Sequence, residues 1–212
     1  MKLYNYFRSS AAYRVRIALN LKGLKPENVF IHLRKNEQRT PDYLKLNPLG
    51  LIPTLVDGDE IITQSLAIIE YLDEMHAAPP LLPATPQERA CVRSIALTIA
   101  CDIHPIDNLR VLNYLTGVLK VSEQQKVEWY AHWVHEGLIA LETRLASDPR
   151  TGRFCHGETP TLADICLIPQ LANARRASMD LAPYPTLLRI EEVCSALPAF
   201  ADAAPAKQPE AA

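Results

Sequence analysis

The sequence lacks several features that would place it at once in a broad functional class. Its formal net charge is −2, which argues against the basic surface of a general nucleic-acid or membrane-surface binder. No apolar run approaches the roughly 18 residues that a membrane-spanning helix needs. Residues 1–5, Met-Lys-Leu-Tyr-Asn, lack the uninterrupted apolar core of a signal peptide. We therefore expect no nucleic-acid partner and no membrane association.

Cysteine is scarce and dispersed. No Cys-x-x-Cys pair occurs, so the spacing indicates neither a disulfide framework nor a zinc site. We expect reduced thiols in core or neutral surface positions, a cytoplasmic location and no metal. The five cysteines are Cys91, Cys101, Cys155, Cys166 and Cys194.

A reactive thiol is also missing from the place where many small redox proteins carry one. Residues 2–6 have the pattern of a strand, and Ser9-Ser10-Ala11 follows at the turn into a helix. Apolar residues from Val15 onward recur at i, i+3 and i+4, which predicts one buried face of that helix. The absence of cysteine from the junction argues against a glutaredoxin-like redox role.

The first part of the chain, residues 1–82, alternates short strand and helix patterns. Residues 29–33 alternate as in a strand, and residues 54–56 and 61–63 flank Asp57-Gly58-Asp59, a strong hairpin signal. Ser65 then begins a helix. The order is βαβ followed by ββα, which predicts a mixed sheet with helices packed on it.

The second part of the chain has only helical periodicity. Residues 83–87 are expected to form a linker, and residues 88–212 a helical domain. Pro105 is expected to kink the first long helix, and Thr161 with Asp164 resembles a capping box. The fold class is therefore an α/β domain followed by an all-α domain. The predicted helices cover residues 88–120, 122–145, 161–174 and 186–197.

Five stretches of the sequence, in order and spread over nearly the whole chain, resemble the zeta-class glutathione transferase family. They are residues 9–19, Asn47-Pro48, Ile52-Pro53, residues 64–72 and residues 180–185. The resemblance implies the glutathione transferase fold, with a thioredoxin-like domain before the helical one, glutathione as cofactor, and a homodimer. The chain departs from the family at Ala11, where the usual motif has cysteine. A cysteine that is absent cannot be required for catalysis, so the thiol is expected to come from glutathione.

The resemblance implies that Ile52-Pro53 carries the family's cis-proline and that the Ile52 backbone pairs with the cysteinyl unit of glutathione. A helix beginning at Ser65 offers free N–H groups and a positive dipole end to the γ-glutamyl carboxylate, although Ser65 could instead cap that helix. Either Ser9 or Ser10 could donate a hydrogen bond to the thiolate while the other caps its helix. The expected glutathione contacts are Ser9, Ser10, Ala11, Gln38, Ile52, Gln64, Ser65, Asp102, His104, Asn108 and Arg110.

Three arginines, Arg8, Arg110 and Arg176, form the other predicted constellation, and Arg175 is the less suitable member of its pair. The family isomerises maleyl dicarboxylates to their fumaryl isomers in aromatic-compound or tyrosine degradation, so these guanidinium groups are expected to clamp two carboxylates. Maleylacetoacetate and maleylpyruvate are both open as substrates. A general glutathione transferase and a non-catalytic binding module are the alternatives. The predicted catalytic residues are Ser9, Ser10, Arg8, Arg110 and Arg176.

Overall fold

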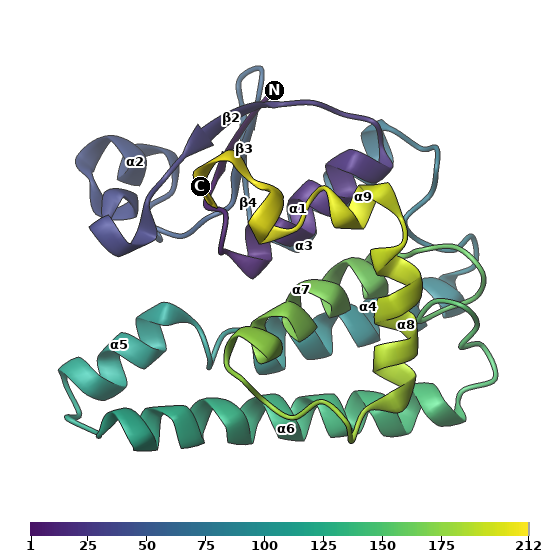
Figure 1. The fold of residues 1–212 in the computed structure, drawn as a ribbon. Coiled ribbons are helices and arrows are strands. Elements are labelled where there is room, and N and C mark those ends of the chain that lie inside the picture. The colour runs from purple at the N-terminus through teal and green to yellow at the C-terminus, as the bar shows by residue number, and fades with distance from the viewer. Residues whose placement is uncertain (212) are drawn as a thin grey trace. The chain divides into compact units, whose positions relative to one another are not determined.

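A computed structural model of the chain describes residues 1–211, which divide into two compact units (Figure 1). The first unit comprises Met1–Leu81 together with the segment from Ser195 onward, and the second comprises Leu82–Cys194. The predicted linker begins one residue after this division. Inside it, Thr85 caps the next helix by accepting a hydrogen bond from the Glu88 N–H at 3.3 Å.

The first unit is built on a four-stranded sheet in the order β2-β1-β3-β4. β1 pairs in parallel with β2 and antiparallel with β3, and β3 and β4 form the predicted hairpin around Gly58, whose φ is +60°. The predicted strand over residues 29–33 is shorter and earlier than expected, because the chain turns into a 3₁₀ helix at Leu33. The strands are β1 (Lys2–Asn5), β2 (Glu27–Phe30), β3 (Thr54–Asp57) and β4 (Glu60–Thr63).

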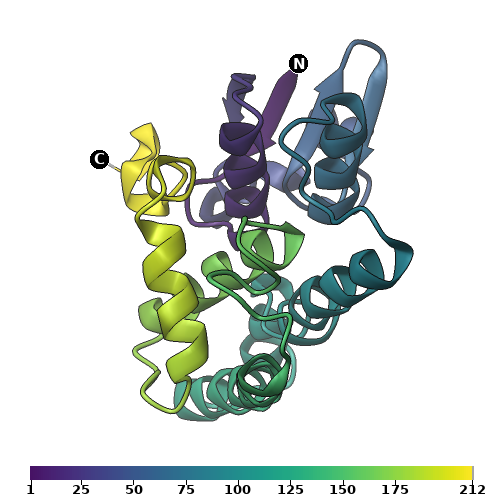
Figure 2. The ribbon, with the colours of Figure 1, turned by 90° about the vertical axis from the view of Figure 1, so that its right-hand side faces the viewer.

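The helices α1 (Ser10–Leu21) and α3 (Ser65–Met75) of the first unit lie side by side, as both ribbon views show (Figures 1 and 2). They bury the predicted apolar faces, since Val15, Ala18, Ile68 and Leu72 are all inaccessible to solvent. The helical elements here are α1 (Ser10–Leu21), η1 (Leu33–Lys35), η2 (Glu37–Arg39), α2 (Pro41–Leu46) and α3 (Ser65–Met75).

The C-terminal segment lies against α1 of the first unit. Tyr13 Oη donates to the Phe200 carbonyl at 3.3 Å, Arg16 Nε to the Ala203 carbonyl at 2.9 Å, and Asn20 Nδ2 to the Ala199 carbonyl at 3.0 Å. These bonds group residues 195–211 with the first unit, whereas the sequence placed residues 88–212 in one helical domain. Short helices α9 (Pro198–Ala201), η4 (Pro205–Lys207) and η5 (Pro209–Ala211) make up the segment.

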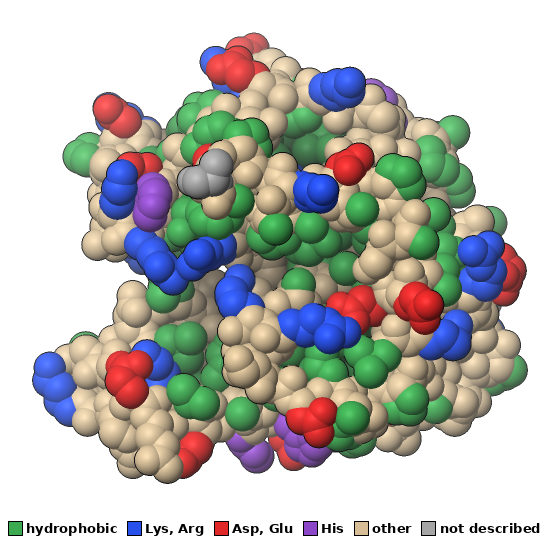
Figure 3. Space-filling model, in the orientation of Figure 1, with side chains coloured by type: hydrophobic (Ala, Val, Ile, Leu, Met, Phe, Trp, Pro, Cys, Tyr) green, Lys and Arg blue, Asp and Glu red, His purple; other side chains and the backbone are tan. Residues whose placement is uncertain are grey.

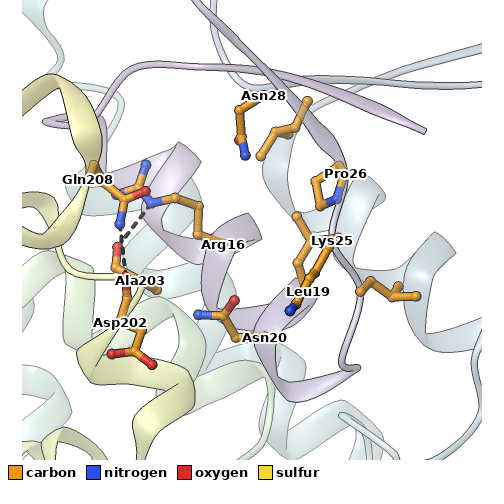
Figure 4. Close-up of a pocket in the computed structure, with 11 residues that line it drawn as sticks. Arg16, Leu19, Asn20, Lys25, Pro26, Asn28, Asp202, Ala203 and Gln208 are labelled. Atoms are coloured by element: carbon orange, nitrogen blue, oxygen red, sulfur yellow. Dashed lines mark hydrogen bonds between the residues drawn. The ribbon is translucent and has the colours of Figure 1, made fainter.

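A pocket of about 280 Å³ lies between α1 and this C-terminal segment. In Figure 4 the Arg16 side chain extends toward Ala203 and Gln208, while Lys25, Pro26 and Asn28 lie on the other side. Burial lowers the pKa of Arg16 to about 10, so the guanidinium stays charged at neutral pH. Its guanidinium donates to oxygen atoms of residues 5–7 and to the Ala203 carbonyl, so Arg16 ties the C-terminal segment to the end of β1.

The second unit is helical throughout. The capping box at Thr161 is confirmed, because Asp164 Oδ2 accepts from the Thr161 N–H at 2.8 Å and the Thr161 hydroxyl caps the helix. Within residues 1–211 no helix is long and apolar enough to cross a membrane. The helices are α4 (Pro86–Leu97), the π-helical turn η3 (Thr98–Ile103), α5 (Leu109–Gly117), α6 (Glu123–Ser147), α7 (Leu162–Arg176) and α8 (Pro185–Ser195).

The predicted helix over residues 88–120 is three elements rather than one kinked helix. Pro105 has no N–H and cannot continue the hydrogen-bond ladder. The last turn before it is wide, with the His104 N–H bonded to the Ile99 carbonyl at 2.9 Å. Asn108 then starts α5 as its N-cap. The break places residues 104–108 in a bend, and four of the predicted site residues lie in or near it.

Candidate functional site

The turn between β1 and α1 carries the first part of the candidate site. Ser9 is the N-cap of α1, and its Oγ accepts from the Ala12 N–H at 3.1 Å. A serine hydroxyl that accepts one hydrogen bond can still donate its own proton. Ser10 and Ala11 are the first two residues of α1 and are buried, whereas Ser9 is only half-buried. Ser9 is therefore the serine able both to cap the helix and to donate to an anion at the helix N-terminus.

The loop before β3 supplies an open stretch of backbone. The Ile52–Pro53 bond is cis, as expected. Tyr43 Oη and Asn47 Nδ2 donate to the Leu51 carbonyl at 2.6 Å and 2.8 Å, which holds the loop. Among the described residues, no hydrogen bond engages the backbone of Ile52. An extended peptide could pair with that backbone, as an added strand does at a sheet edge.

Packing brings this loop close to the start of α1 and to η2. Ile52 shares an apolar cluster with Tyr6, against which Phe7 packs just before the serines. Gly50 has φ +60°, and a Cβ there would lie 2.9 Å from the Gln38 carbonyl oxygen, so only glycine allows this close approach. The Gln38 side-chain Oε1 is buried with no hydrogen-bond partner among residues 1–211. An orphaned buried acceptor beside an open backbone fits a ligand that supplies a donor.

The N-terminus of α3 forms the third part. Gln64 is the N-cap, with φ +70°, a strained conformation for a residue other than glycine, and its side chain makes no capping bond. Ser65 is the first residue of the helix rather than its cap, so the alternative that Ser65 caps α3 is wrong. Its Oγ accepts instead from Arg14 Nη1 at 3.3 Å. The first-turn N–H groups and the positive end of the helix dipole are left for an anion.

Sequence reasoning missed Arg14, although a charged residue in the apolar pattern of α1 was a signal. Its side chain is 1% exposed, and the bond to Ser65 joins α1 to α3. Within the first unit, contacts therefore link α1 to the start of α3, the loop of Ile52 to the segment before Ser9, and that loop to Gln38. Arg8 is an exposed basic residue of the same unit, and Figure 3 shows Lys and Arg side chains interspersed with Asp and Glu side chains on the face that it draws. An exposed guanidinium next to Ser9 favours an anionic ligand.

In the second unit, four predicted residues lie at or near the bend between η3 and α5. Asp102 is exposed in η3, and His104 ends it. Asn108 Oδ1 accepts from the Arg110 N–H at 3.1 Å, so the asparagine oxygen is used as a helix cap. Arg110 is exposed in the first turn of α5. Of these four, Arg110 is the cation available to bind a carboxylate.

The neighbours Arg175 and Arg176 at the end of α7 have different partners. Arg175 Nε donates to Glu191 Oε1 at 3.1 Å, and its Nη2 forms a short ion pair with Glu191 Oε2. Arg176 Nη2 donates to the neutral Asn173 Oδ1 at 2.8 Å. The Glu191 carboxylate neutralises the charge of Arg175. The choice of Arg176 over Arg175 stays a prediction, and the ion pair that engages Arg175 favours it.

Two further residues of the second unit went unnoticed in the sequence. Asp107 is buried beside the bend, and burial raises its pKa to about 7. Burial and the Asp107 charge raise the pKa of Tyr130 to about 12, and Arg176 opposes them. Tyr130 is therefore within electrostatic range of Asp107 and of Arg176. The only signal was an aspartate between the apolar residues Ile103, Ile106 and Leu109.

The chain matches two family models, the glutathione S-transferase N-terminal domain over residues 1–74 and the C-terminal domain over residues 128–202. It is 51% identical over 211 residues to a probable maleylacetoacetate isomerase of Vibrio cholerae, covering 99% of this chain and 97% of that one. A holo structure of maleylpyruvate isomerase, described as a bacterial zeta-class glutathione S-transferase, superposes with a TM-score of 0.98 at 46% identity, covering all of both chains. The chain belongs to the zeta-class glutathione transferase family.

A third relative of this zeta-class chain is the maleylacetoacetate isomerase of Methylobacterium extorquens, solved with bound malonate and glutathione. Its TM-score is 0.97 at 44% identity, and 99% of each chain is covered. The predicted family and fold are thus confirmed.

The cysteines of this zeta-class chain all lie outside the junction at Ser9, where the family motif has its cysteine. Cys91, Cys155, Cys166 and Cys194 are buried, as predicted for core positions, and only Cys101 is exposed. Burial raises the pKa of Cys155 well above its usual range, so this thiol stays protonated and unreactive.

Proposed function

We propose that this chain is a glutathione-dependent isomerase that converts a maleyl dicarboxylate into its fumaryl isomer. The observation that carries the proposal is the junction at Ser9, where the N-terminus of α1 and a serine hydroxyl stand at the position of the family's cysteine. Glutathione, when bound, supplies a thiol whose reversible addition makes the cis double bond a rotatable single bond. The enzyme's own residues then have three tasks, which are binding, charge stabilisation and orientation.

The first unit would hold glutathione. The unpaired backbone of Ile52 suits the cysteinyl unit, and the N–H groups at Gln64 and Ser65 suit the γ-glutamyl carboxylate. Gln38 supplies a further acceptor. Ser9 would donate to the thiolate, and the N-terminus of α1 would stabilise the negative charge, so that the thiol ionises more readily.

The arginines would hold the dicarboxylate. A guanidinium group binds a carboxylate through two parallel N–H···O bonds, which fixes its orientation as well as its position. Arg176 and Arg110 in the second unit and Arg8 in the first are the candidates. Their positive charge would also stabilise the negative charge that moves onto the substrate carbonyl during the reaction. A general transferase for apolar acceptors would need none of these charges.

The relatives support two candidate substrates, because some relatives are named for maleylacetoacetate and others for maleylpyruvate. Both carry the cis double bond and the two anionic ends that the clamp requires. We propose maleylacetoacetate first and maleylpyruvate second, and we also propose a homodimer in the cytoplasm. Reduced, mostly buried cysteines support that location. Light scattering would give twice the chain mass of 23.7 kDa for a dimer.

The test compares rates on maleylacetoacetate and maleylpyruvate with glutathione present and absent. We expect turnover only with glutathione, a fumaryl product, and a glutathione concentration that stays constant over many turnovers. Equal rates without glutathione would contradict the shared-thiol chemistry. Steady consumption of glutathione into a stable conjugate would favour the general transferase instead.

A further inference from the structure

One buried arginine of α1 reaches back to the turn that carries Ser9. Arg16 is 6% exposed and lies about two helical turns after Ser9. Its Nη2 donates to the Phe7 carbonyl at 3.1 Å, and its Nη1 donates to the Tyr6 carbonyl at 3.5 Å. Nη1 also donates to Asn5 Oδ1 at 3.3 Å. The guanidinium group therefore engages all of residues 5–7, which lead from β1 into the turn.

The Tyr6 carbonyl oxygen is shared between Arg16 and Ser9. The Ser9 backbone N–H donates to this oxygen at 3.0 Å, which closes the turn, and the Ser9 hydroxyl accepts from the Ala12 N–H at 3.1 Å. The first bond fixes the backbone of Ser9, and the second orients its side chain. Arg16 therefore restrains the oxygen on which the position of Ser9 depends. A misplacement of about 1 Å in a catalytic site can cost about a hundredfold in rate.

The C-terminal segment fixes the orientation of the Arg16 guanidinium group. Nε donates to the Ala203 carbonyl at 2.9 Å, and Ala203 is 1% exposed. Gln208 Nε2 braces the segment on both sides of Ala203, by donating to the carbonyls of Asp202 and Ala204 at 2.9 Å and 3.1 Å (Figure 4). A planar guanidinium group held at Nε directs its other N–H groups along fixed lines. A lysine ammonium group is a single point and cannot reach the turn and the segment together.

We propose that Arg16 is a positioning residue for the reaction: through the backbone of residues 5–7 it holds Ser9 where the hydroxyl can donate to the thiolate of glutathione. The inference rests on the proposed function in taking Ser9 as that donor. It assigns no contact between Arg16 and glutathione, because each nitrogen of the guanidinium group already donates to a protein oxygen. The C-terminal segment supports the glutathione site through the same side chain.

The experiment follows the thiolate of bound glutathione by its ultraviolet absorbance, on the full chain saturated with glutathione. Arg16→Lys keeps the positive charge but loses the planar fork. We expect the titration midpoint of the thiol to move to higher pH, so that the thiolate fraction on the acid side of the midpoint falls about three- to tenfold, because a hydrogen bond to a charged group is weakened. The value of kcat/KM on the acid side should fall by a similar factor.

Two further variants separate positioning of Ser9 from general damage to the first unit. If Arg16 acts through the Ser9 hydroxyl, Arg16→Lys should cause no further change in the titration once Ser9→Ala is present. Asn20→Ala is the control for a loosened C-terminal segment. It removes the bond from Asn20 Nδ2 to the Ala199 carbonyl at 3.0 Å and leaves residues 5–7 untouched, so it should keep the wild-type titration.

Three results would each overturn the inference: an unchanged titration in Arg16→Lys, an equal change in Asn20→Ala, or a full additional change in the Ser9→Ala background. If Arg16→Lys fails to fold, Asn5→Ala and Asn28→Ala decide. Both remove the bond from Asn5 Nδ2 to Asn28 Oδ1 at 3.0 Å, but only Asn5→Ala also removes an acceptor of Arg16. A shift to higher pH in Asn5→Ala alone would support the inference, and identical titrations would overturn it.

Isomerase rates on the same preparations distinguish this inference from the proposed function. Isomerisation by the wild type together with an unchanged titration in Arg16→Lys would overturn the role of Arg16 alone. The predicted shifts without isomerisation would overturn the proposed reaction alone. An unchanged titration in Ser9→Ala would overturn the roles of both residues, because no donor would remain to be positioned.

Discussion

The two units contribute different kinds of binding group to the candidate site. In the first unit the binding groups are mainly backbone: the free N–H groups of α3, the open Ile52 backbone, and the close approach at Gly50. In the second unit the proposed binding groups are the charged side chains of Arg110 and Arg176. Backbone sites are specified by local geometry and short motifs, whereas charge depends on which side chains the fold brings together. The first kind should respond to changes of shape, and the second to changes of charge.

The strongest test of the charge-based half is Arg176→Ala, with Arg175→Ala as its matched control. Losing one partner of a desolvated charge pair typically costs about 2–5 kcal/mol. We therefore expect kcat/KM for a dianionic substrate to fall by tens- to thousands-fold, since about 1.4 kcal/mol is tenfold. Arg175→Ala breaks only the pair with Glu191 and should leave kcat/KM nearly unchanged. Equal losses in both variants would show that the clamp is wrongly assigned.

The backbone-based half is tested by Gly50→Ala against Gly58→Ala. Both glycines have φ +60°, so both substitutions strain the backbone equally, but only at Gly50 would the added Cβ meet the Gln38 carbonyl at 2.9 Å. We expect Gly50→Ala to lower the free energy of unfolding by about 1–3 kcal/mol more than Gly58→Ala does. Glutathione affinity should fall only in Gly50→Ala, as calorimetry would measure. Similar glutathione affinities in both variants would mean that η2 does not contribute to glutathione binding.

The pH dependence of the stability of Asp107→Asn tests whether Asp107 is buried as a neutral group in the second unit. A carboxyl group whose pKa is raised on folding stabilises the protein when neutral, and that stabilisation is lost as the pH rises through the folded-state value of about 7. From pH 5 to pH 8 the unfolding free energy of the variant should therefore gain about 1–3 kcal/mol relative to wild type. Denaturant titrations at both pH values would measure this. A constant difference would show that Asp107 titrates normally.

The smallest effect is expected from Ser9→Ala, with Ser122→Ala as the control. Both serines are N-caps, of α1 and α6, so each substitution should cost about 1 kcal/mol of stability. Only Ser9→Ala should raise the pKa of the thiol of bound glutathione and move the rate profile to higher pH. The ultraviolet absorbance of the thiolate follows that titration. Identical titrations in the two variants would leave Ser9 with a capping role alone.

Local features of the chain could be predicted because neighbouring residues decide them. The hairpin at Asp57-Gly58, the capping box at Thr161 and the break at Pro105 each follow from turn, cap or ring chemistry within a few residues. The family motifs extended this to the cis bond at Ile52–Pro53, which the structure contains. These signals were enough to predict the α/β and helical parts, whereas the glutathione contacts stay predictions.

Tertiary structure alone decided which of several similar residues has which role. Ser9 rather than Ser10 caps α1, and Gln64 rather than Ser65 stands at the N-cap position of α3, while Ser65 Oγ accepts from Arg14 of another helix. The ion pair that distinguishes Arg175 from Arg176 joins residues 16 positions apart. The burial of Asp107 depends on residues of other helices in the same way. Burial and charge pairing are properties of distant segments brought into contact, so a sequence pattern predicts the helix that carries a residue but not the partner that the residue meets.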